Sequence, residues 1–453
     1  MDVKDKKITV IGLGESGRAA ALLLKVKGAV VYATDSASSA EVLKAAAELR
    51  SLGINVETGA HTRQFLTDSQ FVVISPGVPP GSLVVKWAKE EKIDIIGEIE
   101  LASWFCKGKI VAVTGTNGKS TTVTLIAQIL KDAGKKAILC GNVGNAFCNE
   151  INKIDKGSFV VLEVSSFQLE YIKTFKPFIS VILNISQNHF DRHKDLDEYF
   201  AAKRKIYQNQ TKDDYCLLNY DDKFLKAINK KEIPANLYYF SRRGKTKGAY
   251  EQNDKLYLNT ATASLISSIK DFKLKQPHNI ENFLAASLCA FLCGVSPDAI
   301  KDTITGFEGL EHRAKVVATI NGVSFIDDSK ATTVESTCAA LRSINASVVL
   351  IAGGRNKGSD FSLARDEIGK KVKALILIGE ARHEIKNAFS DFPDIREAAT
   401  MDDAVNIAAK IAKQGEAVLL SPMCASFDMF KDYKHRGEVF KQAVQRLLCE
   451  KRV

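Results

Sequence analysis

The stretch KIVAVTGTNGKSTT, residues 109–122, decides the architecture at the centre of the chain. Its first residues are apolar and predict a short buried strand, and the segment that follows it carries leucine and isoleucine at helical spacing. Between the two lies a turn with two glycines that ends in Lys119 and Ser120. A strand, a Gly-rich turn and a Lys-Ser pair at a helix start are typical of loops that wrap a polyphosphate, because backbone N–H groups there face the anion.

The residues of this turn have distinct expected roles. Lys119 would add a positive charge beside the phosphates, and Ser120 or Thr121 would hold Mg²⁺. The alternative is an ordinary strand-to-helix turn with a surface lysine, but the glycines, the lysine and the hydroxyls together favour the phosphate loop. Val113 stands where the general pattern has glycine, which indicates a compact variant. The expected nucleotide contacts are Gly115, Thr116, Asn117, Gly118, Lys119, Ser120 and Thr121.

Length and composition limit the class of protein. A chain of 453 residues is too long for one core and predicts about three domains. Its 45% hydrophobic and 26% charged residues are typical of a globular protein, and no apolar run reaches the length of a membrane span. The chain enters a strand directly, without a signal peptide, and its nine cysteines form no Cys-x-x-Cys pair. We therefore expect reduced thiols and a cytoplasmic protein.

The chain is basic, with 63 Lys and Arg against 53 Asp and Glu and a net charge of +10. This excess is scattered through lysine-rich helices, without a dense basic block or interleaved aromatic residues. The pattern disfavours nucleic acid as a partner and suits small anionic substrates.

The first domain, expected over residues 1–105, begins with a second glycine motif. Gly12, Gly14 and Gly17 follow a strand, and Asp35 closes the next strand, which matches the dinucleotide fingerprint. Alone, this pattern indicates NAD or FAD, although any nucleotide diphosphate could use the same helix terminus and carboxylate. A third strand, FVVISPGV, ends near Gly77, at the edge where open α/β sheets bind ligands. The joint to the next domain is expected between Glu98 and Lys109.

The second domain, expected over residues 106–308, places polar residues after apolar strands. Glu163 ends one strand and is a Mg²⁺ candidate, because a carboxylate in an apolar strand is unfavourable unless it is paired or binds a metal. Its alternative is a strand-end residue that reaches solvent. His189 follows another strand and is either a ligand or a structural histidine. Lys203, on a following helix, would by default be a solvated surface charge. Polar, hairpin-like sequence then runs from 212 to 275.

The third domain, expected over residues 309–453, again reads as a parallel sheet. Short apolar runs at 323–326, 348–352, 375–378 and 417–420 alternate with helical stretches. The segments DDSKATT, GGRNKGSDF, GE and SPMCASFD follow these runs. The expected fold class is therefore α/β, with three domains on mostly parallel sheets: Rossmann-like, phosphate-loop ATPase-type and Rossmann-like.

Several segments in order resemble the Mur ligase superfamily over essentially the whole chain: GTNGKSTT, LEVSSFQLE, HFDRH, YFAAKRKIY, HNIEN, EHR, DDSKATT, GGRNKGSDF and SPMCASFDMFKDYKHRG. The details of the last four resemble the members that add D-glutamate to UDP-N-acetylmuramoyl-L-alanine. Relatives that add L-alanine, a diamino acid or a dipeptide are the nearest alternatives. Outside this superfamily, an NAD-dependent oxidoreductase leaves Lys119 unexplained, and a nucleotide switch needs no UDP-binding domain.

The resemblance implies a role for each matching residue. The UDP-sugar contacts would be Glu15, Ser16, Asp35 and Gly77, with Asn142 near the muramoyl-alanine part. Two Mg²⁺ sites would use Ser120, Glu163, His189 and Lys203, the last carbamylated by CO₂. Asn279, Asn282, Arg313 and Asp328 would contact ATP, and Lys330 would neutralise charge. Thr332, Lys357, Ser426 and Phe427 would bind the incoming amino acid, with Tyr433 in the same loop.

The implied reaction is amide formation through an acyl phosphate, with Lys119, His189 and Lys203 as the central catalytic residues. Phosphoryl transfer between two anions depends on positioning and on cations. A cation at Lys357 and a hydroxyl at Ser426 favour an acidic amino acid, whereas the D configuration follows only from the resemblance. We expect a monomer.

Overall fold

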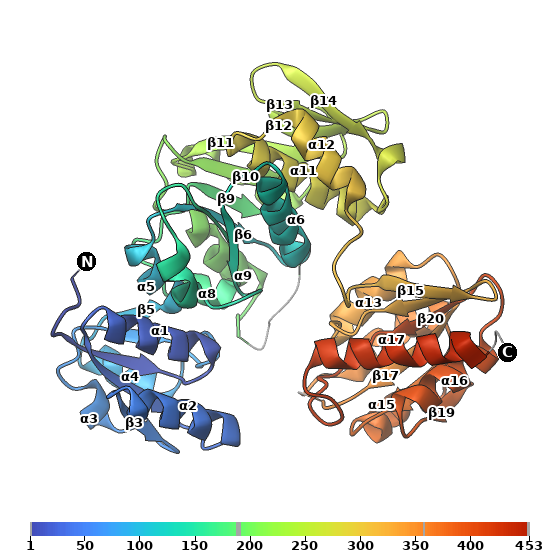
Figure 1. Ribbon diagram of the computed structural model, residues 1–453, viewed down its shortest axis with the longest axis horizontal. Coiled ribbons are helices and arrows are strands. Elements are labelled where there is room, and N and C mark those ends of the chain that lie inside the picture. Colours follow the sequence, from blue (N-terminus) through green and yellow to red (C-terminus); the bar gives the residue numbers. More distant parts are fainter. Residues whose placement is uncertain (1, 187–191, 357, 451–453) are drawn as a thin grey trace. The chain divides into compact units, whose positions relative to one another are not determined.

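The computed structural model describes residues 2–186, 192–356 and 358–450 (Figure 1). The chain divides into two compact units, Met1–Phe307 and Glu308–Val453. Unit 1 contains a five-stranded and a nine-stranded sheet, and unit 2 contains a six-stranded sheet. The expected α/β class with three mostly parallel sheets is therefore confirmed.

The first sheet of unit 1 is parallel throughout, in the order β3-β2-β1-β4-β5. The strand order reverses between β1 and β4, so their carboxyl ends form the edge where such sheets bind ligands. Its elements are β1 Lys7–Ile11, α1 Glu15–Val26, β2 Val30–Asp35, α2 Ala40–Ser51, β3 Asn55–Thr58, α3 Arg63–Leu66, β4 Val72–Ile74, α4 Leu83–Glu90, β5 Ile95–Gly97 and α5 Glu98–Phe105.

The second sheet has the order β14-β13-β12-β11-β10-β9-β6-β8-β7. Strands β6 to β12 pair in parallel, and β12 to β14 form the antiparallel hairpins that the polar sequence predicts. Its strands are β6 Lys109–Thr114, β7 Ala137–Gly141, β8 Phe159–Glu163, β9 Ile179–Ile182, β10 Tyr215–Asn219, β11 Asn236–Ser241, β12 Gly248–Gln252, β13 Lys255–Asn259 and β14 Ala263–Ser268. Its helices are α6 Lys119–Asp132, α7 Phe147–Glu150, α8 Ser166–Glu170, α9 Leu196–Arg204, α10 Lys223–Lys226, α11 Pro277–Leu292 and α12 Pro297–Gly306.

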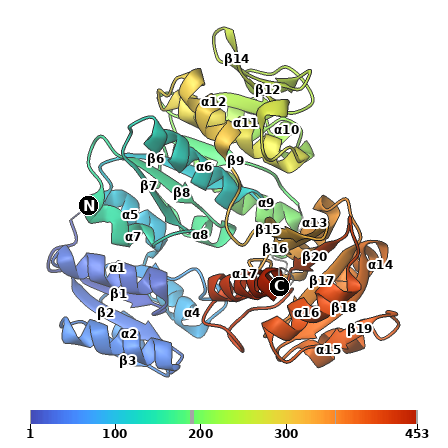
Figure 2. The same ribbon diagram turned by 45° about the vertical axis from the view of Figure 1, so that its right-hand side comes forward.

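Alternate residues of the central strands bury opposite faces of this sheet. Val111 and Val113 of β6 pack with α6, α11 and α12, and these helices lie together in Figure 2. Ile110 and Ala112 face the other way, into a core that they share with the first sheet. Because both faces are covered, the strands read as continuous apolar runs.

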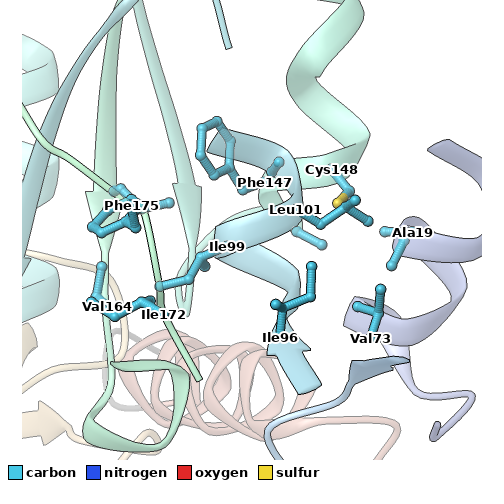
Figure 3. Packing of buried hydrophobic residues seen from close by; sticks show 14 of the residues in the cluster. Ala19, Val73, Ile96, Ile99, Leu101, Phe147, Cys148, Val164, Ile172 and Phe175 are labelled. Atoms are coloured by element: carbon cyan, nitrogen blue, oxygen red, sulfur yellow. The ribbon is translucent and has the colours of Figure 1, made fainter. Parts of the chain in front are cut away.

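The expected joint after residue 97 is a buried helix. Ile99 and Leu101 of α5 are fully buried, and side chains from both sheets of unit 1 surround them (Figure 3). Glu100 is also buried and accepts hydrogen bonds from the amides of Lys173, Thr174 and Phe175. This helix therefore belongs to one continuous core, which explains why residues 1–307 form a single compact unit.

Unit 2 contains the sheet β15-β16-β20-β17-β18-β19, which is parallel except for the β15–β16 hairpin. Helices α13, α14 and α15 share one hydrophobic cluster, and α16 and α17 share another. The elements are β15 Lys315–Ile320, β16 Val323–Asp327, α13 Val334–Ser343, β17 Val348–Gly353, α14 Arg365–Lys371, β18 Val372–Ile378, α15 Arg382–Ala388, β19 Ile395–Glu397, α16 Met401–Ile411, β20 Ala417–Leu420 and α17 Tyr433–Glu450. The four apolar runs of the sequence are thus strands β16, β17, β18 and β20.

In the described part of the chain, all nine cysteines are free thiols, and seven of them are buried. No helix of that part has both the length and the apolar character that a membrane crossing needs.

Candidate active site

The predicted phosphate loop connects β6 to α6, and its backbone requires glycine. Gly115 and Gly118 have φ values of 149° and 83°, in the region that L side chains rarely adopt. A Cβ on Gly118 would lie 2.4 Å from Asn282 Oδ1. Lys119 Nζ folds back over the turn and donates to the carbonyls of Gly115 and Thr116, each at 2.8 Å. The loop therefore holds its lysine beside the N-terminus of α6, where an anion is stabilised.

Residues distant in sequence hold this loop from both sides. Asn184, after β9, accepts from the amide of Asn117 at 2.8 Å and donates back to its carbonyl at 3.2 Å. Asn282 on α11 accepts from Thr122 Oγ1 at 3.2 Å. Asn279, also predicted as an ATP contact, bonds to Gln276 at 2.9 Å, one turn earlier. Asn282 thus lies at the phosphate loop, and Asn184 is a loop contact absent from the residues singled out by sequence.

Glu163 ends β8 and is only 2% exposed, so the alternative of a solvent-reaching residue is wrong. Its Oε1 accepts from Asn142 Nδ2 at 2.8 Å, and its Oε2 is buried without a hydrogen-bond partner. A buried carboxylate oxygen without a partner is unfavourable, and a bound cation removes that penalty.

Lys203 lies on α9 and is 1% exposed, so the default expectation of a solvated lysine is also wrong. Its Nζ donates to Gly115 O at 3.0 Å and to Thr114 Oγ1 at 3.3 Å, next to the phosphate loop. Burial, and then the nearby charge of Lys119, hold the pKa of Lys203 well below its usual value. The two lysines converge on one carbonyl oxygen, and a charged amine at Lys203 is disfavoured there.

His189, predicted as a metal ligand, lies outside the described residues. His193 of the same motif is 2% exposed, and its Nε2 lies 3.0 Å from Ser166 Oγ. Burial lowers the pKa of His193. His193 therefore makes a structural contact that joins the HFDRH motif to the LEVSSFQLE motif.

A magnesium ion fits these groups. In residues 2–186, 192–356 and 358–450, no three His, Cys, Asp or Glu side chains cluster as metal ligands. Mg²⁺, however, commonly uses one or two protein oxygens together with phosphates and water. The buried hydroxyl of Ser120 and the unpartnered Oε2 of Glu163 provide this kind of incomplete donor set.

A cavity of about 410 Å³ lies at the other end of β6, around Lys109 and Phe178, away from the phosphate loop.

The Gly-rich turn after β1 is built for close backbone approach. A Cβ on Gly17 would lie 1.8 Å from Gly12 O, and Ser75 Oγ after β4 donates to Gly12 O at 3.1 Å. Asp35 accepts from Leu13 N at 2.7 Å and from Ala37 N at 2.8 Å. One Asp35 oxygen therefore holds the Gly-rich turn after β1, and the other holds the chain that follows β2. Glu15 and Gly77 are exposed and Ser16 is half-buried, at the switch point of the sheet.

In unit 2, the segment after β16 forms a second buried polar cluster. Asp328 accepts from Ser421 Oγ at 2.8 Å and from Ala314 N at 3.1 Å, and burial raises its pKa to about 7. The charge of the half-buried Arg313 partly offsets this increase in the pKa of Asp328. The amide of Lys330 donates to His312 O at 3.1 Å, and Thr332 N to Lys330 O at 2.8 Å. These contacts join residues 312–314 to the segment that carries Lys330 and Thr332.

Arg436 fixes the neighbouring loop and was not singled out by sequence. It is fully buried, donates to Ser329 Oγ and O at 3.0 and 2.8 Å, and donates to Cys424 O at 3.1 Å. It therefore ties the loop after β16 to the loop after β20, which carries buried Ser426 and exposed Phe427. Tyr433 packs near Lys330, whose Nζ lies 5.4 Å from its ring. Lys357 lies outside the described residues.

Comparisons with known proteins agree along the whole chain. Three family models match: "Mur ligase MurD-like, N-terminal domain" at residues 6–97, "Mur ligase middle domain" at 113–290 and "Mur ligase, glutamate ligase domain" at 312–424. A UDP-N-acetylmuramoylalanine–D-glutamate ligase of Thermoanaerobacter pseudethanolicus is 41% identical over 99% of this chain and 100% of its own. A ligase of the same name from Koribacter versatilis is 39% identical over 99% of both chains.

Solved structures support the fold. The UDP-N-acetylmuramate-alanine ligase MurC of Thermotoga maritima aligns over 97% of this chain and 99% of its own, with 18% identity and a TM-score of 0.59. The MurF ligase of the same organism, in complex with ADP, aligns over 98% and 96%, with 14% identity and a TM-score of 0.57. Together with the full-length relatives, these findings establish that the chain belongs to the Mur ligase family, among the UDP-N-acetylmuramoylalanine–D-glutamate ligases.

Proposed function

We propose that this chain joins D-glutamate to UDP-N-acetylmuramoyl-L-alanine at the expense of ATP, in the synthesis of peptidoglycan precursors. The full-length likeness to ligases of this name is the observation that carries the proposal. The phosphate loop agrees with it, because a carboxylate is a poor electrophile and must first receive a phosphoryl group. The amine of the amino acid then attacks the acyl phosphate and releases phosphate.

The residues of the phosphate loop would position and neutralise the ATP phosphates. The amides at the start of α6 would face the phosphates, and the Nζ of Lys119, which bonds to the carbonyls of Gly115 and Thr116, lies at the same turn. On binding ATP, Lys119 would exchange its two carbonyl partners for phosphate oxygens. The proposed nucleotide contacts of unit 2 are Arg313 and Asp328, with Lys330 beside them.

We propose Ser120 and Glu163 as the protein ligands of one Mg²⁺, and His189 and carbamylated Lys203 as ligands at a second. The ions would supply positive charge to the phosphates and to the acceptor carboxylate. Burial of Lys203 beside the loop supports the modification, because CO₂ reacts with an uncharged amine and the carbamate supplies oxygen ligands.

The acceptor would lie at the switch point of the first sheet. Glu15, Ser16 and Gly77 are the proposed UDP-sugar contacts, and Asp35 would act by ordering the Gly-rich turn, since it accepts from the amide of Leu13. Asn142 is proposed near the muramoyl-alanine part, and Asn279 and Asn282 on the nucleotide side. Thr332, Lys357, Ser426, Phe427 and Tyr433 are proposed for the amino acid.

We propose that the chain has three domains, with boundaries at 1–105, 106–308 and 309–453, and that it is a monomer. We also propose that it acts in the cytoplasm, which supplies ATP and the UDP-linked acceptor.

The test is phosphate release by the full chain with ATP, Mg²⁺, acceptor and D-glutamate. We expect release only when both acceptor and amino acid are present, and a loss of about 10²–10³ in rate for Lys119→Ala with an unchanged circular dichroism spectrum. Slow release that needs no acceptor would indicate a nucleotide switch. Oxidation of NADH without phosphate release would indicate an oxidoreductase.

A further inference from the structure

Asn142 touches Glu163 twice. Its side-chain Nδ2 donates to Glu163 Oε1 at 2.8 Å, and its backbone N donates to Glu163 O at 2.9 Å. The orientation of the amide follows from chemistry, because an ionised carboxylate only accepts hydrogen bonds and so must face the NH₂ group. Asn142 is exposed, whereas Glu163 is buried, so an exposed amide fixes the direction of a buried carboxylate.

The backbone around Asn142 is also fixed. Gly141 has φ of 100°, and a Cβ there would lie 2.4 Å from Glu163 O, so the chain passes close against the end of β8. The amide of Gly141 donates to Asn145 O at 2.9 Å, which closes the loop over residues 141–145. The backbone of Asn142 is therefore held against the end of β8, and only the side-chain torsions remain to be ordered in the contact with Glu163.

We propose that Asn142 is a positioning residue for the metal ligand Glu163: it holds Oε1 so that Oε2 alone is presented to the cation. The proposal rests on the proposed function, which makes Glu163 a magnesium ligand. It explains why one oxygen of this carboxylate is hydrogen-bonded while the other is buried without a partner. Substituting a residue that orients a metal ligand in this way commonly lowers the metal affinity 10- to 100-fold.

The same loop contains a matched control. Asn145 Nδ2 donates to Oε1 of the buried Glu150 at 2.7 Å, in the same type of contact. Glu150 also pairs with Lys153 at 2.9 Å, so its charge is already compensated by the protein. Asn145→Ala removes an amide–carboxylate contact from this loop without touching Glu163.

The test measures Mn²⁺ binding to the full chain by electron paramagnetic resonance, with and without ADP. We expect Glu163→Gln to lose binding, Asn142→Ala to weaken it about tenfold, and Asn145→Ala to stay within about twofold of wild type. Raising Mg²⁺ should restore the kcat of Asn142→Ala but not that of Glu163→Gln.

Three results would overturn the proposal. The first is unchanged Mn²⁺ affinity in Asn142→Ala, whether or not the KM for the acceptor rises. The second is an equal loss in Asn145→Ala, which would indicate a general effect of the loop. The third is unchanged binding in Glu163→Gln. Phosphate release by the wild-type chain, measured separately, distinguishes these results from a failure of the proposed ligase activity.

Discussion

At the scale of single residues, burial separates chemically active side chains from ordinary ones. Lys203 has the sequence context of a surface lysine on a polar helix, yet its amine is buried against Gly115 O and the ring of Tyr199. Glu163 likewise differs from a solvated strand end only in the contacts that surround it. The apolar strand singled out Glu163, whereas only the resemblance to the Mur ligases singled out Lys203. The groups that surround both residues come from strands and loops elsewhere in the chain.

Lys203→Ala should be nearly inactive if the carbamylated lysine is a metal ligand. Short carboxylic acids should then partly restore the rate, because their oxygens can occupy the vacated ligand position. The measurement is phosphate release with increasing acetate or formate, together with a ¹³C carbamate signal in wild-type protein supplied with ¹³CO₂. If the Lys203→Ala enzyme is active and the wild type shows no carbamate signal, Lys203 is not carbamylated.

At the scale of elements, the strand, turn and helix around the phosphate loop were predictable because their pattern is local. The expected strand and turn correspond to β6 and residues 115–118, and α6 begins at Lys119. The contacts that hold the loop were not predictable, since Asn184 and Asn282 reach it from distant parts of the chain. Arg436 was missed for the same reason: a lone arginine on a helix gives no sign that it joins two loops.

Gly118→Ala tests this element. A Cβ there combines an unfavourable φ with an approach of 2.4 Å to Asn282 Oδ1, so the loop must shift and turnover should fall at least tenfold. Gly134→Ala is the matched control, because it has φ of 73° at the other end of α6 but no atom within 4 Å. It should retain turnover and lose about 1 kcal/mol of stability. Equal turnover in the two variants would contradict the account of the loop.

At the scale of the whole molecule, the two sheets of unit 1 share a core that contains an unusual carboxyl group. Glu98 at the start of α5 is 2% exposed, accepts from Cys148 N at 2.6 Å, and has an Oε2 without a hydrogen-bond partner. Burial raises its pKa from 4.5 to about 7. In this pH range the folded state binds more protons than the unfolded state, so stability falls as pH rises from about 4.5 to about 7.

Glu98→Gln should remove this pH dependence while keeping an acceptor for Cys148 N. Its gain in unfolding free energy over wild type should be larger at pH 8 than at pH 5, by on the order of 2 kcal/mol. Both tryptophans, Trp87 and Trp104, lie in unit 1, so urea unfolding followed by tryptophan fluorescence reports this unit alone. The same gain at both pH values would show that Glu98 does not titrate as described.

The central claim, that the chain adds D-glutamate to a UDP-linked muramoyl-alanine, is tested most directly by the mass of the product. The full chain is incubated with ATP, Mg²⁺ and UDP-N-acetylmuramoyl-L-alanine, and separately with D-glutamate, L-glutamate, L-alanine, L-lysine or diaminopimelate. The account predicts a product heavier by one glutamyl residue with D-glutamate alone, with one phosphate released per product. Product with a diamino acid instead, or no product with D-glutamate, would contradict it.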